Sequence, residues 1–317
     1  MKKAWGHMII LGLAVLAVAA CSRNLEGFSS VEPEPSSQSQ SVVESLAQPP
    51  LPLPSVSSGE VETPSSADLF LPPLPMTADF DQIAVLGHEL VQWGPGVHVD
   101  ERGRSTACID LQKKYGGFNA DFIAADRPTV TLTFDEGYEN GYTTPILDTL
   151  KEKGVRAVFF LTGHYIESQP ELVQRMIDEG HILGNHSNKH KVYVTELTLE
   201  ESLEDAKWMH DRLREDFDYE MRLFRLPEGA FCEQSLALLQ QMGYKSLFWS
   251  FAYRDWDPQN QMEPQEAMDR IMATLHPGEI MLLHAVGETN SLILPELIDA
   301  IREEGYEIRP YDEIENF

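Results

Sequence analysis

The stretch TVTLTFDEG, residues 129–137, runs from a mainly apolar segment into two acids and a glycine. Its Val, Leu and Phe residues, spaced by Thr, are typical of a buried strand. Asp135 and Glu136 stand at the end of that strand, where an unpaired buried charge would cost several kcal/mol. We therefore expect solvent or a cation to reach these two carboxylates.

The same order of strand and then helix continues from this stretch to the C-terminus. Strands are predicted at residues 129–135, 155–163, 181–186, 221–227, 244–251, 278–286 and 306–314. Helices are predicted at residues 144–154, 170–180, 198–213, 233–243, 264–275 and 294–305. Four of these helices end at a glycine that a strand follows directly, which is typical of a left-handed C-cap: Gly154, Gly180, Gly243 and Gly305.

This alternation predicts an α/β fold with a parallel sheet and outer helices. About seven strands in fewer than about 200 residues favour a distorted, incomplete (β/α) barrel, because a full eight-fold barrel typically needs about 250 residues. A doubly wound open sheet is the alternative. In both folds the active site lies at the C-terminal ends of the strands.

Titratable residues stand at the ends of six predicted strands, which is more than chance would place there. They are Asp135, Glu136, His164, His186, Arg225, the stretch Arg254–Asp255–Trp256, and His284. This group predicts a catalytic site at that end of the sheet.

The segment HSNKH places His186 and His190 four residues apart, just after a strand. On a helical turn this spacing sets both imidazoles on one face. Two imidazoles and a carboxylate of TFDEG would form a three-ligand site with open positions, suited to catalytic Zn²⁺ or Fe²⁺. A solvated histidine pair around Lys189 is the alternative.

Two further residues have predicted roles in catalysis. His284 is a candidate general acid, and Arg225 is a candidate partner for a carboxylate base. His284 ends the apolar strand that contains LLHA, so a general-acid role competes with that of a neutral core histidine. Arg225 follows MRLF, where an exposed salt bridge fits poorly, and it could hold a carboxylate in its charged form.

The motifs TFDEG, HSNKH, RLPEG, RDW and LLH resemble, in order and spacing, those of the polysaccharide deacetylases, the nodulation-type deacetylase domain of carbohydrate esterase family four. The resemblance covers residues 127–317. Within it, TFDEGYENGYT, TGHYI, DEGHILGNHS and FWSFAYRDW are similar to the delta-lactam-biosynthetic de-N-acetylases of spore-forming bacteria. Those enzymes remove acetyl groups from muramic acid in peptidoglycan.

The resemblance implies a metal-dependent amidohydrolase acting on N-acetyl groups of peptidoglycan. It implies that Asp135 is the general base, Arg225 orients that base, His284 is the general acid and Asp255 belongs to the catalytic group. It implies a divalent metal, expected to be zinc, on His186, His190 and Glu136. The substrate-binding residues that it implies are His164, Tyr165, Gly229 and Trp256.

Three departures from the family pattern are visible. Glu136 is one methylene longer than the aspartate usual there. Ala252 replaces the first acid of the fourth motif, which leaves open what sets the charge of His284. Leu226 and Glu228 alter the stretch after the arginine. Two alternatives follow, namely a deacetylase of N-acetylglucosamine or another glycan, and a catalytically impaired glycan-binding lipoprotein.

The N-terminus indicates export. Lys2 and Lys3 precede a short apolar stretch, residues 8–20, and small residues lead to Cys21. We expect a signal peptide at residues 1–20 and a lipidated Cys21, with ordinary secretion as the alternative. Residues 21–80 hold the lipidated cysteine and a Pro/Ser-rich linker. Residues 81–126 are expected to pack on the barrel as an extension.

The formal net charge of −27 argues against nucleic acid as a partner and against electrostatic docking to an anionic membrane. We therefore expect a monomer outside the cytoplasm that meets the membrane only through its lipid anchor. Its expected partner is a peptidoglycan glycan strand. Cys108 and Cys232 are expected to be small buried residues.

Overall fold

The computed structural model describes residues 72–311, which belong to one compact unit. The signal peptide, Cys21 and the linker up to residue 71 lie outside the described residues, as does the end of the last predicted strand. Between residues 72 and 311, every helix is too short or too polar to span a bilayer.

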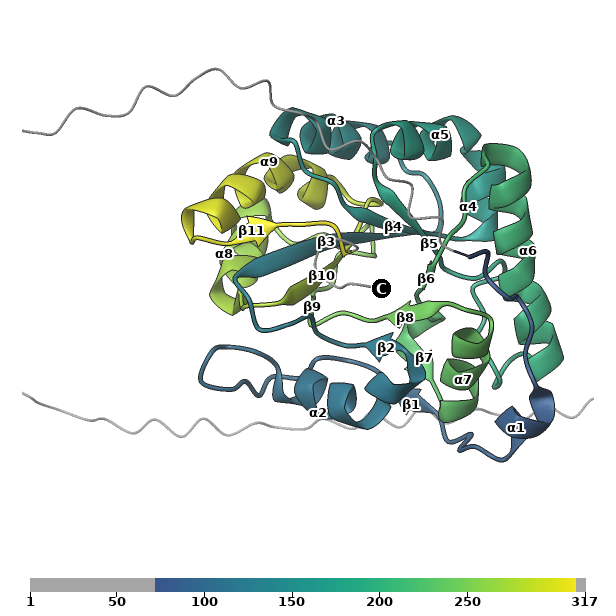
Figure 1. The fold of residues 1–317 in the computed structure, drawn as a ribbon. Coiled ribbons are helices and arrows are strands. Elements are labelled where there is room, and N and C mark those ends of the chain that lie inside the picture. The colour runs from purple at the N-terminus through teal and green to yellow at the C-terminus, as the bar shows by residue number, and fades with distance from the viewer. Residues whose placement is uncertain (1–71, 312–317) are drawn as a thin grey trace, which may run out of the picture. The chain divides into compact units, whose positions relative to one another are not determined.

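A curled parallel sheet lies at the centre of the unit (Figure 1). Its strands follow the spatial order β2 (Ala120–Asp121), β8 (Lys245–Leu247), β6 (Leu223–Phe224), β5 (Ile182–Asn185), β4 (Val158–Leu161), β3 (Thr129–Glu136), β10 (Glu279–His284) and β9 (Phe251–Ala252). The short strand β11 (Glu307–Ile308) also pairs with β3. The sheet has two edges, β2 and β9, so the predicted incomplete barrel is confirmed.

Helices cover the outside of the sheet (Figure 1). They are α3 (Thr143–Lys153), α5 (Pro170–Asp178), α6 (Leu199–Phe217), α7 (Glu233–Gln241), α8 (Pro264–Thr274) and α9 (Glu288–Glu303). Each overlaps a predicted helix, although α9 begins earlier than residue 294. The four glycines after α3, α5, α7 and α9 all have positive φ, so the predicted left-handed caps are confirmed.

Local sequence explains where these helices begin. Thr198 and Glu201 form both hydrogen bonds of a capping box at the start of α6. Pro170 occupies the first turn of α5, where its missing N–H costs nothing. Residues 162–168 differ from the prediction. The predicted strand stops at Leu161, and Thr162 caps the short helix α4 (Gly163–Ser168).

The chain before β3 contributes to the barrel wall. It forms α1 (Phe80–Ala84), β1 (Val91–Gln92), α2 (Thr106–Tyr115), the 3₁₀ turn η1 (Gly116–Phe118) and the edge strand β2. Strand β1 pairs antiparallel with β7 (Ala230–Phe231), which follows the 3₁₀ turn η2 (Pro227–Gly229). A side chain at Gly278 would place Cβ 2.3 Å from the carbonyl oxygen of Ala125, so this approach requires glycine. Cys108 and Cys232 are free and buried, as predicted.

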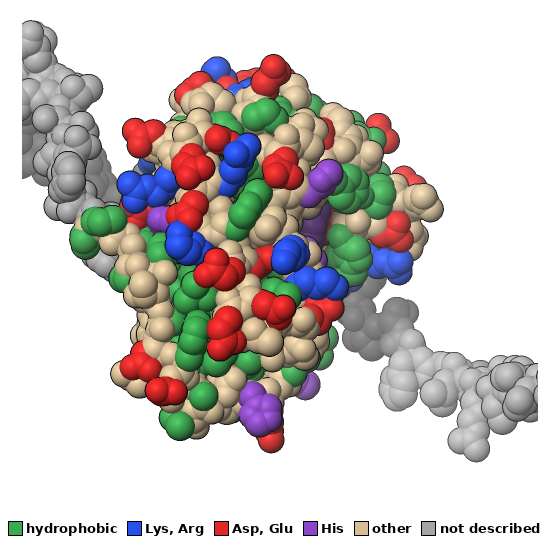
Figure 2. Space-filling model, turned by 90° about the vertical axis from the view of Figure 1, so that its right-hand side faces the viewer, with side chains coloured by type: hydrophobic (Ala, Val, Ile, Leu, Met, Phe, Trp, Pro, Cys, Tyr) green, Lys and Arg blue, Asp and Glu red, His purple; other side chains and the backbone are tan. Residues whose placement is uncertain are grey.

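Charged side chains of both signs are interspersed over the face of the unit drawn in Figure 2. Helix α6 carries i,i+4 ion pairs of Lys207 with Asp211 and of Arg212 with Asp216. Such exposed pairs contribute little stability, but they keep a helix surface soluble.

Candidate active site

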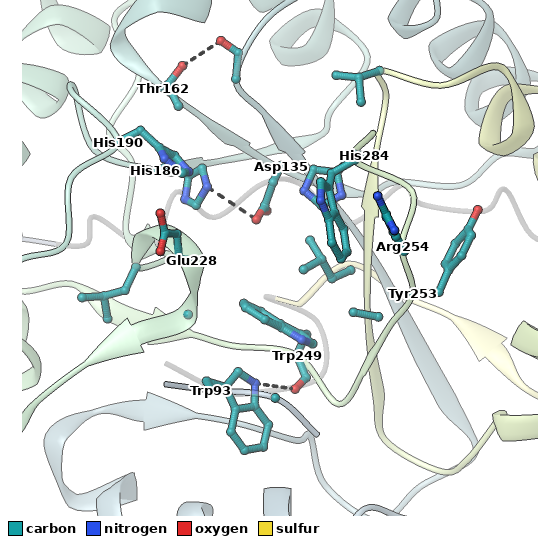
Figure 3. Close-up of a pocket in the computed structure, with 18 of the residues that line it drawn as sticks. Trp93, Asp135, Thr162, His186, His190, Glu228, Trp249, Tyr253, Arg254 and His284 are labelled. Carbon is teal, nitrogen blue, oxygen red and sulfur yellow. Dashed lines mark hydrogen bonds and ion pairs between the residues drawn. The ribbon is translucent and has the colours of Figure 1, made fainter. Parts of the chain in front are cut away.

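A cleft of about 1020 Å³ opens at the C-terminal ends of the strands (Figure 3). It brings together many of the residues that the sequence predicted for the site. Those that line it are Asp135, His164, His186, His190, Gly229, Trp256 and His284. Arg225 and Asp255 lie buried beneath them, whereas Glu136 and Tyr165 point elsewhere.

Asp135 is held by the buried guanidinium of Arg225. Nη1 of Arg225 donates to Oδ1 of Asp135 and to the Thr133 hydroxyl, both at 2.8 Å. The other nitrogens of Arg225 donate to the backbone carbonyls of Leu247 and Phe248. The guanidinium carbon lies 4.1 Å from the centre of the Phe160 ring, within reach of a cation–π interaction. These contacts fix the direction from which Arg225 meets the carboxylate.

The charge of Asp135 follows from this pairing. Burial alone would raise the pKa of Asp135, but Arg225, together with His186 and His284, lowers it below its ordinary value. The carboxylate is therefore ionised at neutral pH. Its Oδ2 faces the cleft side of the site, 3.5 Å from Nε2 of His186 (Figure 3).

His284 is held by Asp255 and by a residue that the sequence did not single out, Asn290. Nδ1 of His284 lies 2.8 Å from Oδ1 of Asp255, and the backbone N–H of His284 donates to Oδ2. The amide of Asn290 donates to the same Oδ2 at 2.6 Å and to the carbonyl of His284 at 2.9 Å. The Tyr253 hydroxyl in turn donates to Oδ1 of Asn290. The imidazole is thus anchored at Nδ1, which leaves Nε2 for substrate.

Ala252 replaces the acid that the family pattern places near the general-acid histidine, and the structure shows which other acid contacts His284. Burial would lower the pKa of His284, but Asp255, with a smaller effect of Asp135, raises it above its ordinary value. Ala252 sits in β9 beside Leu282 and carries no charge. The carboxylate that favours a charged His284 is therefore Asp255.

His186 and His190 lie side by side, but not on a helical turn as predicted. Residues 186–190 form a loop in which Ser187 and His190 have positive φ. The two rings are 5.0 Å apart between centroids and nearly perpendicular. The left-handed conformations of Ser187 and His190, and not helical periodicity, bring the two imidazoles together.

The protonation state of His186 leaves one nitrogen free for a ligand. Burial lowers the pKa of His186 to about 4, so the imidazole is neutral at pH 7. Its Nδ1 lies 2.8 Å from the carbonyl oxygen of Arg225 and must donate there, since a carbonyl only accepts. The lone pair on Nε2 then faces Oδ2 of Asp135. Because both atoms can only accept, a proton, water or cation must bridge them.

Glu136 does not complete the predicted three-ligand site. Successive side chains of a strand point to opposite faces, so Glu136 turns away from the cleft that Asp135 enters. Glu136 is fully buried, and neither carboxyl oxygen has a hydrogen-bond partner. Burial, with Glu139 and Asp135 nearby, raises the pKa of Glu136 well above its ordinary value. The Glu136 side chain therefore lies buried outside the cleft that the two histidines line.

The donor set therefore fits a divalent metal only in part. His186 and His190 offer two imidazoles, and Asp135 is the carboxylate that faces them. Among residues 72–311, however, no group of three His, Cys, Asp or Glu side chains has the arrangement that holds a metal ion. The structure does not place Glu136, the predicted third ligand, beside the two histidines.

Of the residues predicted to bind substrate, some line the cleft and one does not. His164 and Trp256 are exposed at the cleft, and the Trp256 ring lies 6.3 Å from that of His284. Gly229 lines the floor with positive φ, where a Cβ would come 2.6 Å from the Trp249 ring. Tyr165 is fully buried and its hydroxyl lies 3.2 Å from that of Thr143, so the substrate-binding role expected for Tyr165 is wrong.

Sequence reasoning missed one wall of the cleft, formed by the chain before β3. Trp93, Gly94 and Pro95 line it, and the indole N–H of Trp93 donates to the carbonyl of Trp249 at 3.1 Å. No spacing or motif marks this wall in the sequence, because β1 reaches the site only by pairing with β7.

The comparisons with known proteins agree with this geometry. A sequence profile of the polysaccharide deacetylase family matches residues 123–247. Peptidoglycan-N-acetylmuramic acid deacetylase PdaA of Bacillus subtilis is 38% identical over 236 residues, which are 74% of this chain and 89% of PdaA.

Solved structures resemble the fold over most of their length. The structure of PdaA, described as a family 4 carbohydrate esterase, matches with a TM-score of 0.67 and 34% identity, covering 71% of this chain and 97% of that one. A family 4 carbohydrate esterase from Bacillus anthracis matches with a TM-score of 0.60 and 36% identity, covering 73% and 98%. The chain thus belongs to the polysaccharide deacetylase family, together with these family 4 carbohydrate esterases.

Proposed function

We propose that this chain hydrolyses the acetamido group of N-acetylmuramic acid residues in peptidoglycan. The observation that carries the proposal is the pair of Asp135 and His284, which face one cleft and are held by partners of opposite character. Arg225 favours the ionised form of Asp135, and Asp255 favours the protonated form of His284. The name of PdaA supports muramic acid as the substrate.

The residues of the cleft suit amide hydrolysis. Asp135 takes a proton from water, whose oxygen bonds to the acetyl carbon. The C–N bond then breaks, and Nε2 of His284 gives its proton to the leaving amine, so acetate and a free amine result. A divalent ion, expected to be zinc, would be held by His186 and His190 and would polarise the acetyl oxygen.

The product has a further reaction open to it. A free amine on muramic acid lies next to the lactyl carboxylate of the same sugar and could close on it to form a delta-lactam, with loss of water. The resemblance to enzymes of spore-forming bacteria supports this product and a role in sporulation.

We place the enzyme outside the cytoplasm as a monomer, on a lipid anchor at Cys21 with a Pro/Ser-rich arm. The arm ends before the predicted residue 80, because Leu74 and Met76 are buried in the core of the folded unit. Cys21→Ala should move the protein from the membrane fraction to the soluble exterior. Retention in the membrane fraction would instead indicate an uncleaved N-terminal helix.

Acetate release from peptide-free and intact peptidoglycan, and from a chitin oligomer, tests the function. We expect release from muramic residues of peptide-free glycan, assigned by mass spectrometry. Asp135→Asn should lower turnover by about two to four orders of magnitude. Release only from glucosamine residues would support the alternative glucosamine deacetylase.

The departure of Glu136 from the metal-binding pattern favours one other function, a catalytically impaired glycan-binding lipoprotein. It predicts that the chain binds peptidoglycan but releases no acetate at any metal concentration. The same assay, run beside a sedimentation assay with insoluble peptidoglycan, separates the two functions.

A further inference from the structure

The cleft has a charge balance unlike that of the whole chain. The chain carries a formal net charge of −27, yet Lys189, Arg254 and Arg270 all line the cleft. The carboxylates that line it are Asp135 and Glu228, and Arg225 already neutralises the first. An anionic group on a substrate would therefore find excess positive charge here.

The charges are also arranged unequally. In Figure 3, Glu228 and Arg254 lie on opposite sides of Asp135, with Glu228 near the histidine pair and Arg254 beyond His284. Glu228 holds a left-handed backbone conformation, with φ of 59°, although it is not glycine. Such backbone strain in a non-glycine residue occurs most often at functional sites.

Two of the arginines that line the cleft are available to a ligand. The guanidinium of Arg254 lies 3.1 Å from Asp257, but its side chain is 58% exposed, so this ion pair is weak. Arg270 projects from α8, is exposed, and has no ion-pair partner among residues 72–311. An arginine can bind a carboxylate through two parallel hydrogen bonds.

The chemistry of the substrate supplies an anion at the corresponding place. N-acetylmuramic acid differs from N-acetylglucosamine by a lactyl ether on C3, next to the C2 carbon that carries the acetamido group. The lactyl carboxylate is ionised when no peptide is attached and neutral once it forms an amide. With the acetamido group between Asp135 and His284, the orientation of the sugar decides whether this carboxylate is directed toward Glu228 or toward Arg254.

We propose that Arg254, assisted by Arg270, binds the free lactyl carboxylate of the muramic residue, and that Glu228 repels it from the opposite wall. This inference rests on the proposed function and extends it, because it names the residues that distinguish muramic acid from glucosamine. It also gives Glu228 a role, since one anionic wall allows a single orientation of the sugar.

Three oligosaccharides of equal length test the proposal. They are a peptide-free muramic acid–glucosamine oligomer, the same oligomer with its lactyl carboxylates converted to methylamides, and a chitin oligomer. Acetate release gives kcat/KM for each, and mass spectrometry assigns the sugar that has reacted. Arg254→Gln and Arg254→Lys are compared with Arg102→Gln, a matched control whose arginine is 54% exposed and pairs with Asp126 at 3.0 Å.

We expect Arg254→Gln to lower kcat/KM for muramic residues about 10- to 100-fold, as for loss of a charge-assisted hydrogen-bonded pair. Arg254→Lys should lie between Arg254→Gln and the unaltered chain, because lysine keeps the charge but not the paired donors. Turnover of chitin should be unaffected by either change, and Arg102→Gln should match the unaltered chain. The methylamide oligomer should already be a poor substrate and should lose nothing further in Arg254→Gln.

Equal losses on all three oligomers, or none on the muramic one, would overturn the inference while leaving the deacetylase function in place. If the unaltered chain released acetate from none of the oligomers, the proposed function would fail and this inference with it.

Discussion

Asp135 and Glu136 are adjacent in the sequence but lie in opposite environments. Asp135 is paired with Arg225 and enters the cleft, whereas Glu136 is buried and its carboxyl oxygens have no hydrogen-bond partner. The family resemblance implied a functional role for both acids. The position of Asp135 agrees with that role, whereas the position of Glu136 does not. The difference has a direct consequence for metal binding.

We predict that Glu136→Gln leaves the metal content of the purified protein unchanged, whereas His190→Ala lowers it severely. The reason is that His190 faces the cleft and the Glu136 side chain does not. Elemental analysis of both variants measures this. His164→Ala serves as a control, since it removes a cleft imidazole outside the histidine pair. Equal metal loss in Glu136→Gln and His190→Ala would show that Glu136 is a ligand after all.

The pH profile tests the pair of His284 and Asp255. The raised pKa of His284 extends its protonated form to higher pH, and the lowered pKa of Asp135 keeps the base ionised down to acidic pH. Activity should fall below the pKa of Asp135 and above that of His284. In Asp255→Asn the supporting charge is lost while burial remains, so the pKa of His284 falls and the alkaline limb moves to lower pH.

Asp257→Asn is the control for this shift, because Asp257 lies two residues away and pairs with Arg254 instead. Its alkaline limb should stay in place. Asn290→Ala should leave the limb close to its place, since Asp255 keeps its charge and loses only one hydrogen bond. An unmoved limb in an Asp255→Asn variant that still folds would assign the limb to another group.

At the scale of elements, the pairing of β4 with β5 positions the Phe160 ring that contacts Arg225. Phe160 of β4 is paired with Gly184 of β5, and the Phe160 ring lies against the guanidinium of Arg225. A Cβ on Gly184 would come 2.5 Å from the Phe160 ring. The absence of a side chain at Gly184 therefore leaves the space that Phe160 needs to contact Arg225.

We predict that Gly184→Ala lowers both stability and turnover. Overpacking of this kind costs about 1–3 kcal/mol, and displacement of Arg225 should lower kcat by about tenfold or more. Thermal unfolding and acetate release measure the two effects. Gly117→Ala is the control, because a Cβ there meets no atom within 4 Å. A variant as stable and active as the unaltered chain would contradict the packing argument.

At the scale of the whole molecule, the chain before β3 belongs to the folded unit. Strand β2 pairs with β8 at one edge of the sheet, and Trp93 closes a wall of the cleft. We predict that a protein beginning at residue 72 unfolds cooperatively and stays active, whereas one beginning at residue 128 does not fold into a soluble monomer. Calorimetry and gel filtration of both proteins measure this. An active protein beginning at residue 128 would show that the segment is dispensable.

The sequence by itself determined the order of strands and helices, the glycine caps and the placement of polar residues at strand ends. These features depend on neighbouring residues, through periodicity, capping and turn geometry, so local reasoning reached them. Thr198 and the glycine at position 154 are examples, since each acts within a few residues of its own position.

The tertiary structure alone decided which atoms of these residues meet. Arg225 meets Asp135 across 90 positions of sequence, and Asn290 meets Asp255 across 35. Neither contact leaves a local pattern, because sheet register and curvature set it. The direction of each side chain is likewise a matter of the pleat and of burial, which turned Glu136 and Tyr165 away from the cleft. The sequence therefore predicted the type of chemistry at the strand ends, whereas the packing of the fold determines which of these residues face the cleft.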